Sequence, residues 1–397
     1  MRVTVDRDAL VAALGTAARA TRTNATLPVL AGVLVQASET AVRLTATDLD
    51  LTIQTSVAAT VEDPASIVLP ARYLLELTRR LPPGEVRIEV QDTAAVVQAG
   101  RSRFTLHGMP ARTFPAVPSI EGEPVMLNAG ALRDLLRRTR FAVLADETRP
   151  ILTGVELRGD GERLRAVATD SYRIACAEKH GLGFKPIPST VLPGRALAEV
   201  ERLLRDDEES VTLFLAQSSA TVEVGDVRVT TRVLEGQYPD VLGLVPQEYP
   251  HQARVNRQEL VDALGRADLL AGAHTQSKHQ VVLDFDAGRI VVTAQDPELG
   301  TAREEVPAGY EGQRLVIGFN ARYLLDGLRV IDAEEVEIRL IDPKSPAVVQ
   351  GVGEDGFRYI VLPVLIRSDV APALGSEVGA EYGGKEVVGA SSPAAEV

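Results

Sequence analysis

Apolar and polar residues alternate along much of the chain, and three stretches of this alternation carry nearly the same letters. The stretches are residues 42–53, 164–176 and 290–299. Each predicts a strand, a tight turn that opens with an aspartate, and a second strand, because every second residue is apolar on either side of the turn. We expect each turn aspartate to bind backbone amides of its own turn through its carboxylate.

The turn aspartates Asp48, Asp170 and Asp296 recur at two nearly equal intervals of about 120 residues, a spacing that indicates a repeated domain and not a short solenoid unit. Turn-rich segments near 118–123 and 246–252 are the natural boundaries between such domains. The three expected domains are residues 1–121, 122–248 and 249–366.

Each domain is also expected to contain an early and a late amphipathic helix. Capping residue types precede the early helices, namely Asp6, Asn128 and Asn256. The late helices, near 70–81, 193–205 and 320–331, have Pro70 or Pro193 suited to the first turn or Asn320 suited to the cap. The side chains expected to point inward are Leu10, Leu14, Ala17, Tyr73, Leu74, Leu77, Leu81, Leu132, Leu135, Leu136, Leu197, Val200, Leu204, Leu260, Leu264, Ala267, Tyr323, Leu324, Leu328 and Ile331. Every domain then reads strand, helix, strands, helix, strands, an α+β fold whose helix-and-strands half occurs six times.

Composition narrows the class of protein. Of 397 residues, 45% are hydrophobic, which is typical of a globular protein with ordinary cores. No run of about 18 apolar residues occurs, so we expect no membrane helix, and the polar N-terminus predicts a cytoplasmic protein. Cys176 is the single cysteine and cannot form an internal disulfide. Residues 367–397 lack periodicity and are rich in small and acidic residues, which predicts a disordered tail.

The net charge of −13 argues, taken alone, against a partner with a phosphate backbone. Arginines nevertheless gather on the six predicted helices, while acidic residues dominate the segments between them. For a single helix such arginines usually form an ordinary solvated face. If six equivalent helices turn one face to a common centre, however, that centre is positive, and a duplex is surrounded without being held tightly.

The sequence contains no recognisable catalytic, phosphate-binding or metal-binding motif. There is no phosphate-binding Gly-x4-Gly-Lys-Ser/Thr loop. The carboxylate pair Asp48 and Asp50 is not kept in the second repeat, where Tyr172 is the counterpart of Asp50. His274 and His279 have no further cysteine or histidine nearby. We therefore expect no catalytic residue, metal or cofactor. Two competing classes stay open: an enzyme that uses the Thr-Asp turns as a carboxylate site, and a peptide-binding scaffold without a DNA role.

Residues 1–366 resemble the bacterial DNA polymerase III beta subunit, the replicative sliding clamp. The motifs that carry the resemblance are TLPVL at 26–30, ATD at 46–48, GRSRF at 100–104, VATDSYR at 167–173, GQYPD at 236–240, IGFN at 317–320 and VLP at 361–363. The resemblance implies a head-to-tail homodimer, a ring of six clamp domains with helices lining the hole and sheets outside. It also implies a non-catalytic processivity subunit that encircles duplex DNA and tethers the polymerase.

The resemblance further implies three working surfaces. DNA-facing positions are Arg22, Asn24, Arg72, Arg79, Arg137, Arg149 and Arg195. The dimer interface is implied at Arg101, Arg103, Phe104, Leu106, Leu269, Leu270, Glu304 and Glu305. A peptide pocket is implied at Leu152, Thr169, Ser171, Tyr172, Arg173, Ile174, Pro239, Gly243, Leu244, Val361, Leu362, Pro363 and Val364. The peptides it takes are short segments of the DNA polymerase III alpha subunit, the clamp loader, repair polymerases and ligase.

Three positions depart from the family pattern. Asn24 replaces a frequent arginine in the DNA-facing set, and Gly243 and Leu365 replace frequent arginines at the rim of the pocket. A more apolar rim is expected to change which peptides bind. The altered rim leaves an alternative function open. In this alternative the protein is a second clamp copy, whose pocket excludes a clamp-directed inhibitor but still admits replication partners.

Overall fold

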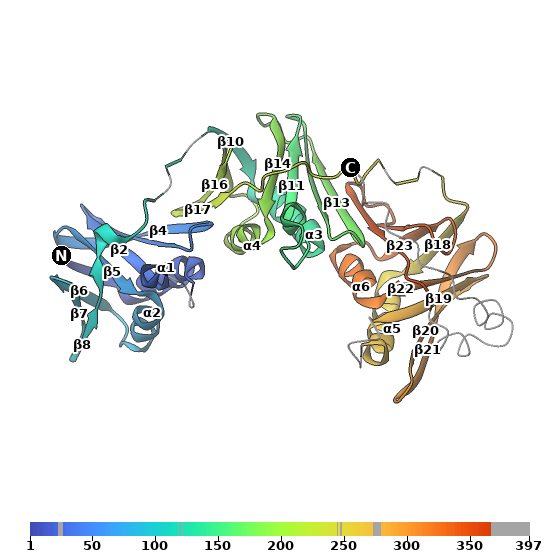
Figure 1. Cartoon of the computed structure of the whole chain (residues 1–397), viewed down its shortest axis with the longest axis horizontal. Coiled ribbons are helices and arrows are strands. Elements are labelled where there is room, and N and C mark those ends of the chain that lie inside the picture. The colour runs from blue at the N-terminus through green and yellow to red at the C-terminus, as the bar shows by residue number, and fades with distance from the viewer. Residues whose placement is uncertain are drawn as a thin grey trace. The chain divides into compact units, whose positions relative to one another are not determined.

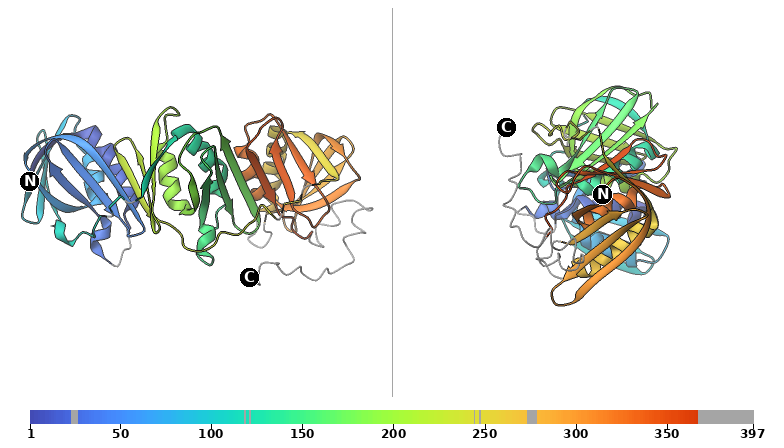
Figure 2. Two further views of the ribbon diagram at one scale, coloured as in Figure 1. Left: turned by 90° about the horizontal axis from the view of Figure 1, so that it is seen from above. Right: turned by 90° about the vertical axis from the view of Figure 1, so that its right-hand side faces the viewer.

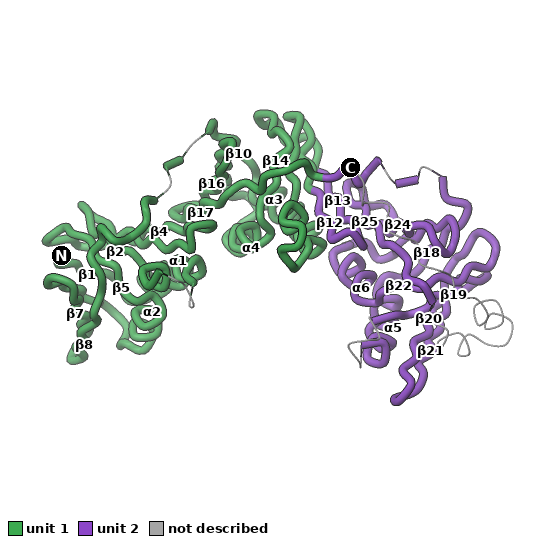
Figure 3. The backbone as a smooth tube through the Cα atoms, in the orientation of Figure 1, with its two compact units in different colours: residues 1–166, 179–238 green, residues 167–178, 239–397 purple. Residues whose placement is uncertain are grey.

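The computed structural model describes residues 1–22, 27–117, 119–120, 122–243, 245–246, 248–272 and 279–366. The predicted tail at 367–397 and the residues Asn24, Leu244 and His274 lie outside this part. The chain divides into two compact units (Figure 3). Unit one holds residues 1–166 and 179–238, and unit two holds residues 167–178 and the chain from 239 onward.

The predicted order of strand, helix, strands, helix, strands is confirmed in all three repeats. The first repeat consists of β1 Arg2–Asp6, α1 Arg7–Ala17, β2 Gly32–Ser38, β3 Ala41–Thr47, β4 Leu51–Asp63, β5 Ala65–Pro70, α2 Ala71–Arg80, β6 Glu85–Gln91, β7 Ala94–Ala99 and β8 Ser102–His107, followed by the short β9 Met109–Pro110. The second consists of β10 Glu123–Asn128, α3 Ala129–Thr139, β11 Gly154–Gly159, β12 Arg163–Thr169, β13 Arg173–His180, β14 Ile187–Pro193, α4 Gly194–Leu203, β15 Ser210–Leu215, β16 Ser219–Val224 and β17 Val227–Arg232. The third consists of β18 His251–Asn256, α5 Arg257–Ala271, β19 Gln280–Asp286, β20 Arg289–Asp296, β21 Gly300–Glu311, β22 Leu315–Asn320, α6 Ala321–Val330, β23 Glu335–Leu340, β24 Ala347–Gly351 and β25 Phe357–Val361. Each half is therefore one strand, one helix and three strands.

Helix starts follow the capping signals in the sequence. The side chains of Asp6, Asn128 and Asn256 each accept a hydrogen bond from the backbone three residues ahead, at 2.9 to 3.1 Å. Pro70 and Pro193 stand at the N-cap itself and not in the first turn. Within each repeat the early and late helices lie side by side (Figures 1 and 2). Among the described residues no helix is both long enough and apolar enough to cross a membrane.

The core is built mostly from the predicted apolar stripes. Leu10, Leu14 and Leu74 are fully buried. The prediction was wrong for Tyr73, whose side chain is 68% exposed. In α2 the buried face runs through Ala71, Leu74 and Thr78, and Tyr73 lies about 100° away from Leu74 around the helix axis.

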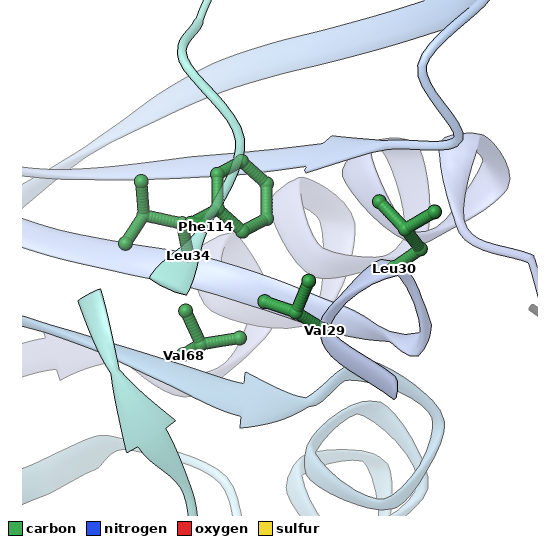
Figure 4. Close-up of a cluster of buried hydrophobic side chains, with 5 residues drawn as sticks. All are labelled: Val29, Leu30, Leu34, Val68 and Phe114. Carbon is green, nitrogen blue, oxygen red and sulfur yellow. The ribbon is translucent and has the colours of Figure 1, made fainter. Parts of the chain in front are cut away.

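A smaller apolar cluster closes the first repeat (Figure 4). Phe114, which follows the last strand of the repeat, packs on Leu34 of β2 and Val68 of β5 together with Val29 and Leu30. Residues far apart in the sequence thus meet in one cluster, as expected for a domain that folds around its own core.

The two joints between consecutive repeats are made by equivalent pairs of strands. In unit one, β4 pairs antiparallel with β17, so that Leu51 lies opposite Thr231. In unit two, β13 pairs antiparallel with β25, so that Arg173 lies opposite Val361. In both joints the strand that follows the aspartate turn meets the last strand of the next repeat, and pairing begins three residues after the aspartate.

Among the described residues, one last strand of a repeat and one strand that follows an aspartate turn are not part of such a joint, and each has an unpaired edge. The last strand of the first repeat, β8, pairs with β7 alone. The first part of β21, residues 300–307, pairs with β20 on one side only, because β18 pairs with residues 308–311. Unpaired strand edges attract further strands.

Asp134 on α3 gathers three cations. Its carboxylate lies 2.7 Å from Lys179 Nζ, 2.8 Å from Arg137 Nη2 and 2.8 Å from Arg138 Nε. Burial by itself raises the pKa of Asp134, but the hydrogen bonds from Lys179, Arg137 and Arg138 outweigh it and lower the pKa to about 2. The cluster therefore favours the folded state whenever the carboxyl group is ionised.

Asp134→Asn is expected to lower the free energy of unfolding by about 2 kcal/mol at pH 7, because a carboxyl pKa depressed by nearly two units stabilises the fold by that amount. The stabilisation is complete above the unfolded pKa and is lost as the pH falls through about 2. The difference in free energy of unfolding between the parent protein and the variant should therefore be about half as large at pH 3 as at pH 7. Urea unfolding across this range measures it, and the exposed Asp226→Asn is the control, with a change below about 0.5 kcal/mol. A difference in free energy of unfolding that does not change with pH would contradict a stabilising role of the ionised Asp134.

Candidate interaction surfaces

The aspartate turn of the second repeat is a rigid unit. Asp170 Oδ1 accepts hydrogen bonds from the amides of Tyr172 at 2.9 Å and Arg173 at 3.1 Å. Thr169 Oγ1 accepts from the amide of Ser171 and donates to the Arg173 carbonyl, at 3.1 and 2.7 Å. The side chain of Tyr172 is held outward, 59% exposed. The predicted backbone-binding role of Asp170 is thus confirmed.

The other two turns repeat this geometry. Asp48 Oδ1 accepts from the amides of Asp50 and Leu51, at 3.1 and 2.8 Å. Asp296 Oδ1 accepts from the amides of Glu298 and Leu299, at 3.0 and 2.9 Å. In all three turns the acceptor binds the second and third amides after itself, which is the local pattern that a turn aspartate favours.

Arg173 ties this turn to the helix α6. Its Nε donates to Asp170 Oδ2 at 2.9 Å and its Nη1 donates to Asp326 Oδ2 at 2.6 Å. The guanidinium lies 4.5 Å from the centroid of the Tyr323 ring. Burial alone lowers the pKa of Arg173, but Tyr359 and the two carboxylates outweigh burial and raise the pKa above its ordinary value. Arg173 is therefore a fixed cation that positions the turn.

Three tyrosines pack around Arg173, and of these Tyr359 was not identified from the sequence. The rings of Tyr172 and Tyr323 stack with centroids 6.3 Å apart and an interplanar angle of 26°. The buried Tyr359 donates its hydroxyl proton to the Tyr323 carbonyl at 2.7 Å, and burial raises the pKa of Tyr359. Only the placement of α6 beside β13 and β25 in unit two reveals these partners of the predicted Arg173.

The structure brings together two segments of the predicted peptide pocket, 169–174 and 361–364. The Leu362 amide donates to the Tyr172 carbonyl at 2.9 Å, next to the strand pair of Arg173 and Val361. Ile174 and Val361 are buried below, whereas Leu362 is partly exposed. The two segments therefore form a surface with an apolar floor and an exposed aromatic side chain, Tyr172.

The remaining described residues of the predicted pocket lie outside these two segments of the chain. Pro239 and Gly243 lie exposed on the segment that enters unit two. Leu152 lies in unit one, 4% exposed, in the short helix η5 Pro150–Thr153. A hollow of about 830 Å³ lies elsewhere in unit one, between β11, β12 and β14, and includes none of the predicted pocket residues.

The predicted dimer residues lie on exposed surfaces of both units. On β8, Phe104 is 44% exposed and Leu106 is partly exposed, so neither is the core residue that a Phe-x-Leu strand usually supplies. At the end of α5, Leu269 is 75% exposed and Leu270 is partly exposed. Arg101 lies in the turn before β8.

Glu304 and Glu305 of the predicted dimer interface already have partners within the chain. Arg266 Nη2 lies 2.7 Å from Glu304, and this hydrogen bond is the main reason that the pKa of Glu304 is lowered. Arg289 Nη1 lies 3.2 Å from Glu305. Both ion pairs are solvent-exposed and contribute little to stability, so they leave the carboxylates available for further cations.

Most of the predicted DNA-facing arginines are exposed, but several hold carboxylates of their own chain. Arg79 lies 3.0 Å from Glu76, and Arg137 contacts Asp134 as described above. Arg195 donates to Asp48 Oδ2, which joins the second helix of one repeat to the aspartate turn of the repeat before it. The exposed positions are Arg22, Arg72, Arg79, Arg149 and Arg195, and Arg137 is partly exposed.

Comparisons with known proteins agree with the three-repeat architecture. Family models described as the N-terminal, central and C-terminal domains of the DNA polymerase III beta subunit match residues 1–118, 126–240 and 243–365. A beta sliding clamp of Synechococcus elongatus is 35% identical over 376 residues, 93% of this chain and 100% of the relative. A beta sliding clamp of Staphylococcus aureus is 31% identical over 375 residues, 92% of this chain and 99% of the relative.

Solved structures show the same likeness in three dimensions. The DNA polymerase sliding clamp of Bacillus subtilis has a TM-score of 0.87 and 31% identity, covering 92% of this chain and 100% of its own. The sliding clamp of Pseudomonas aeruginosa bound to griselimycin has a TM-score of 0.85 and 33% identity, with the same coverage.

Proposed function

Because the chain belongs to the DNA polymerase III beta subunit family, we propose that two copies close head to tail around duplex DNA and tether the replicative polymerase to it. Each copy supplies three clamp domains, residues 1–121, 122–248 and 249–366. In this role the chain is a processivity subunit of the polymerase, and it works in the cytoplasm.

The observation that carries the proposal is the strand joint that occurs twice within the chain. In each joint, a strand that follows an aspartate turn pairs with the last strand of the next repeat. The third turn is followed by the open edge at 300–307, and the first repeat ends with the open edge of β8. Pairing β21 of one copy with β8 of another copy repeats the same joint. Two such joints give a closed ring of six domains.

Apolar and charged residues on these two edges support the same joint. Phe104 and Leu106 lie on β8, and the exposed Leu269 lies on α5, which packs on β21. Arg101 and Arg103 of one copy then approach Glu304 and Glu305 of the other, so the charges at the joint are complementary.

Enclosure explains how an acidic protein stays on DNA. A closed ring cannot leave a duplex sideways, so retention does not require strong phosphate contacts. Strong contacts would release counterions and slow sliding. The exposed arginines at 22, 72 and 195 supply a modest, sequence-independent attraction, whereas the net charge of −13 repels DNA elsewhere.

The surface formed by 169–174 and 361–364 is our candidate for tethering partners. A short peptide with a glutamine and two large apolar side chains suits it, since burying two such side chains contributes about 3–6 kcal/mol before the cost of ordering the peptide. We propose that the DNA polymerase III alpha subunit, the clamp loader, repair polymerases and ligase bind here through such peptides.

Loading onto a nicked circular DNA tests the ring. We expect the loaded protein to stay on the circle through gel filtration and to leave within minutes after a restriction enzyme cuts the circle. Bulky proteins bound at both new ends should prevent the loss, because they block sliding off. Protein that remains on DNA with free ends would contradict enclosure. Protein that binds the peptides but is never retained on circles would favour the scaffold without a DNA role.

A further inference from the structure

Two exposed apolar side chains are explained by neither core packing nor the surfaces described above. Tyr73, on the first turn of α2, is 68% exposed. Leu299, in the third aspartate turn, is 62% exposed although its amide is bound to Asp296. Single exposed apolar side chains are common on protein surfaces, so the meaning of these two depends on the positions that they occupy in the repeat.

Both joints within the chain bring the same two elements into contact, although through different positions of each. In unit one, Arg195 on the first turn of α4 bonds to Asp48 in the turn of the first repeat. In unit two, Tyr323 on the first turn of α6 stacks on Tyr172 in the turn of the second repeat. In each case the first turn of a late helix contacts the aspartate turn of the repeat before it.

Tyr73 and Leu299 stand at the positions that Tyr323 and Arg173 occupy in the joint of unit two. Tyr73 is the third residue of α2, as Tyr323 is the third residue of α6. Leu299 is the third residue after Asp296, as Arg173, which covers the Tyr323 ring, is the third after Asp170. Among the three described repeats, none precedes the repeat that contains α2 and none follows the third turn. A second copy is therefore the occupant that the repeat predicts.

We propose that Tyr73 of one copy packs on Leu299 of the next copy, a second apolar contact in the ring joint that is separate from Phe104, Leu106, Leu269 and Leu270. The neighbouring charges fit this pairing, since Arg72 lies beside Tyr73 and Glu298 beside Leu299. The inference rests on the proposed ring. It accounts for the outward position of Tyr73, which the helical pattern of the sequence placed in the core.

A double-mutant cycle on the full-length protein tests the contact. Tyr73→Ser, Leu299→Ser and the combined variant are compared by fluorescence-detected sedimentation over a dilution series. Each single change should raise the dimer dissociation constant about ten-fold or more, because the contact is lost at both joints of the ring. The combined variant should be no weaker than about the weaker single variant, since the same contact is lost once. Met126→Ser removes a similarly exposed apolar side chain, 64% exposed on β10, and should leave the constant unchanged.

The outcomes separate this contact from the ring itself. Single variants with unchanged dissociation constants, or effects that multiply in the combined variant, would overturn the contact while the ring stands, provided that Leu270→Asp measured alongside yields monomers. If Leu270→Asp also stays dimeric and the parent is not retained on circular DNA, the ring fails, and the contact fails with it. Thermal unfolding of each variant confirms that the changes at these exposed positions leave the domains folded.

Discussion

Leu270→Asp is expected to leave the protein monomeric at micromolar concentration and to abolish its retention on circular DNA. Leu270 lies in the last turn of α5, next to Leu269, whose side chain is 75% exposed. In the proposed joint both leucines meet Phe104 and Leu106 of the other copy. A carboxylate placed there loses its water without gaining a partner, which costs several kcal/mol.

A closed ring contains two such joints, so the cost is paid twice when the dimer forms. Since about 1.4 kcal/mol is ten-fold in affinity, we expect the dimer dissociation constant to rise by at least about a thousand-fold. Sedimentation equilibrium measures it. Gln258→Asp places the same group at an exposed position on the same helix and should leave the dimer intact. A Leu270→Asp protein that sediments as a dimer would place the interface elsewhere.

Ending the chain after Val361 is expected to weaken binding of a clamp-binding peptide by at least about a hundred-fold. The deletion removes Leu362 and Val364, whose amides bind the Tyr172 and Gly318 carbonyls at 2.9 and 2.8 Å. It thus removes one wall of the apolar surface and the hydrogen bond that holds that wall to the aspartate turn. Loss of about 3 kcal/mol of apolar burial corresponds to the expected change in affinity.

The matched control ends the chain after Ile366, which keeps the wall and removes only 367–397. It should bind a fluorescent peptide in an anisotropy titration as tightly as the full-length protein does. Both truncated proteins should remain dimeric, since neither lacks β8 or α5. Equal binding by the two truncated proteins would show that peptides dock on another surface. Weaker binding by the control than by the full-length protein would assign a role to the tail.

The local features of this protein could be predicted from its sequence because the interactions that form them span only a few residues. The three turn aspartates bind amides two and three residues ahead. Asp6, Asn128 and Asn256 cap helices through amides three residues ahead. Repetition of such short-range signals was enough to predict three similar domains and six halves.

Helical periodicity was less reliable at the edges of an apolar stripe. Tyr73 and Tyr323 stand at the same position of equivalent helices, and both were expected inside. Tyr323 is partly buried because Tyr172 and Arg173 cover it, whereas Tyr73 is exposed. The pattern defines a face of the helix, but what covers that face depends on the neighbouring repeat.

By itself, the sequence determined the repeat, the order of strands and helices, and the turns and caps, because each is set by hydrogen bonds and apolar periodicity within a short segment. Only the tertiary structure decided which repeats are joined and through which side chains. Arg173 meets Asp326 across 153 residues, and Arg195 meets Asp48 across 147. Contacts over such separations leave no periodic signal, since they exist only after the strands that follow the turns have paired with the last strands of the next repeats.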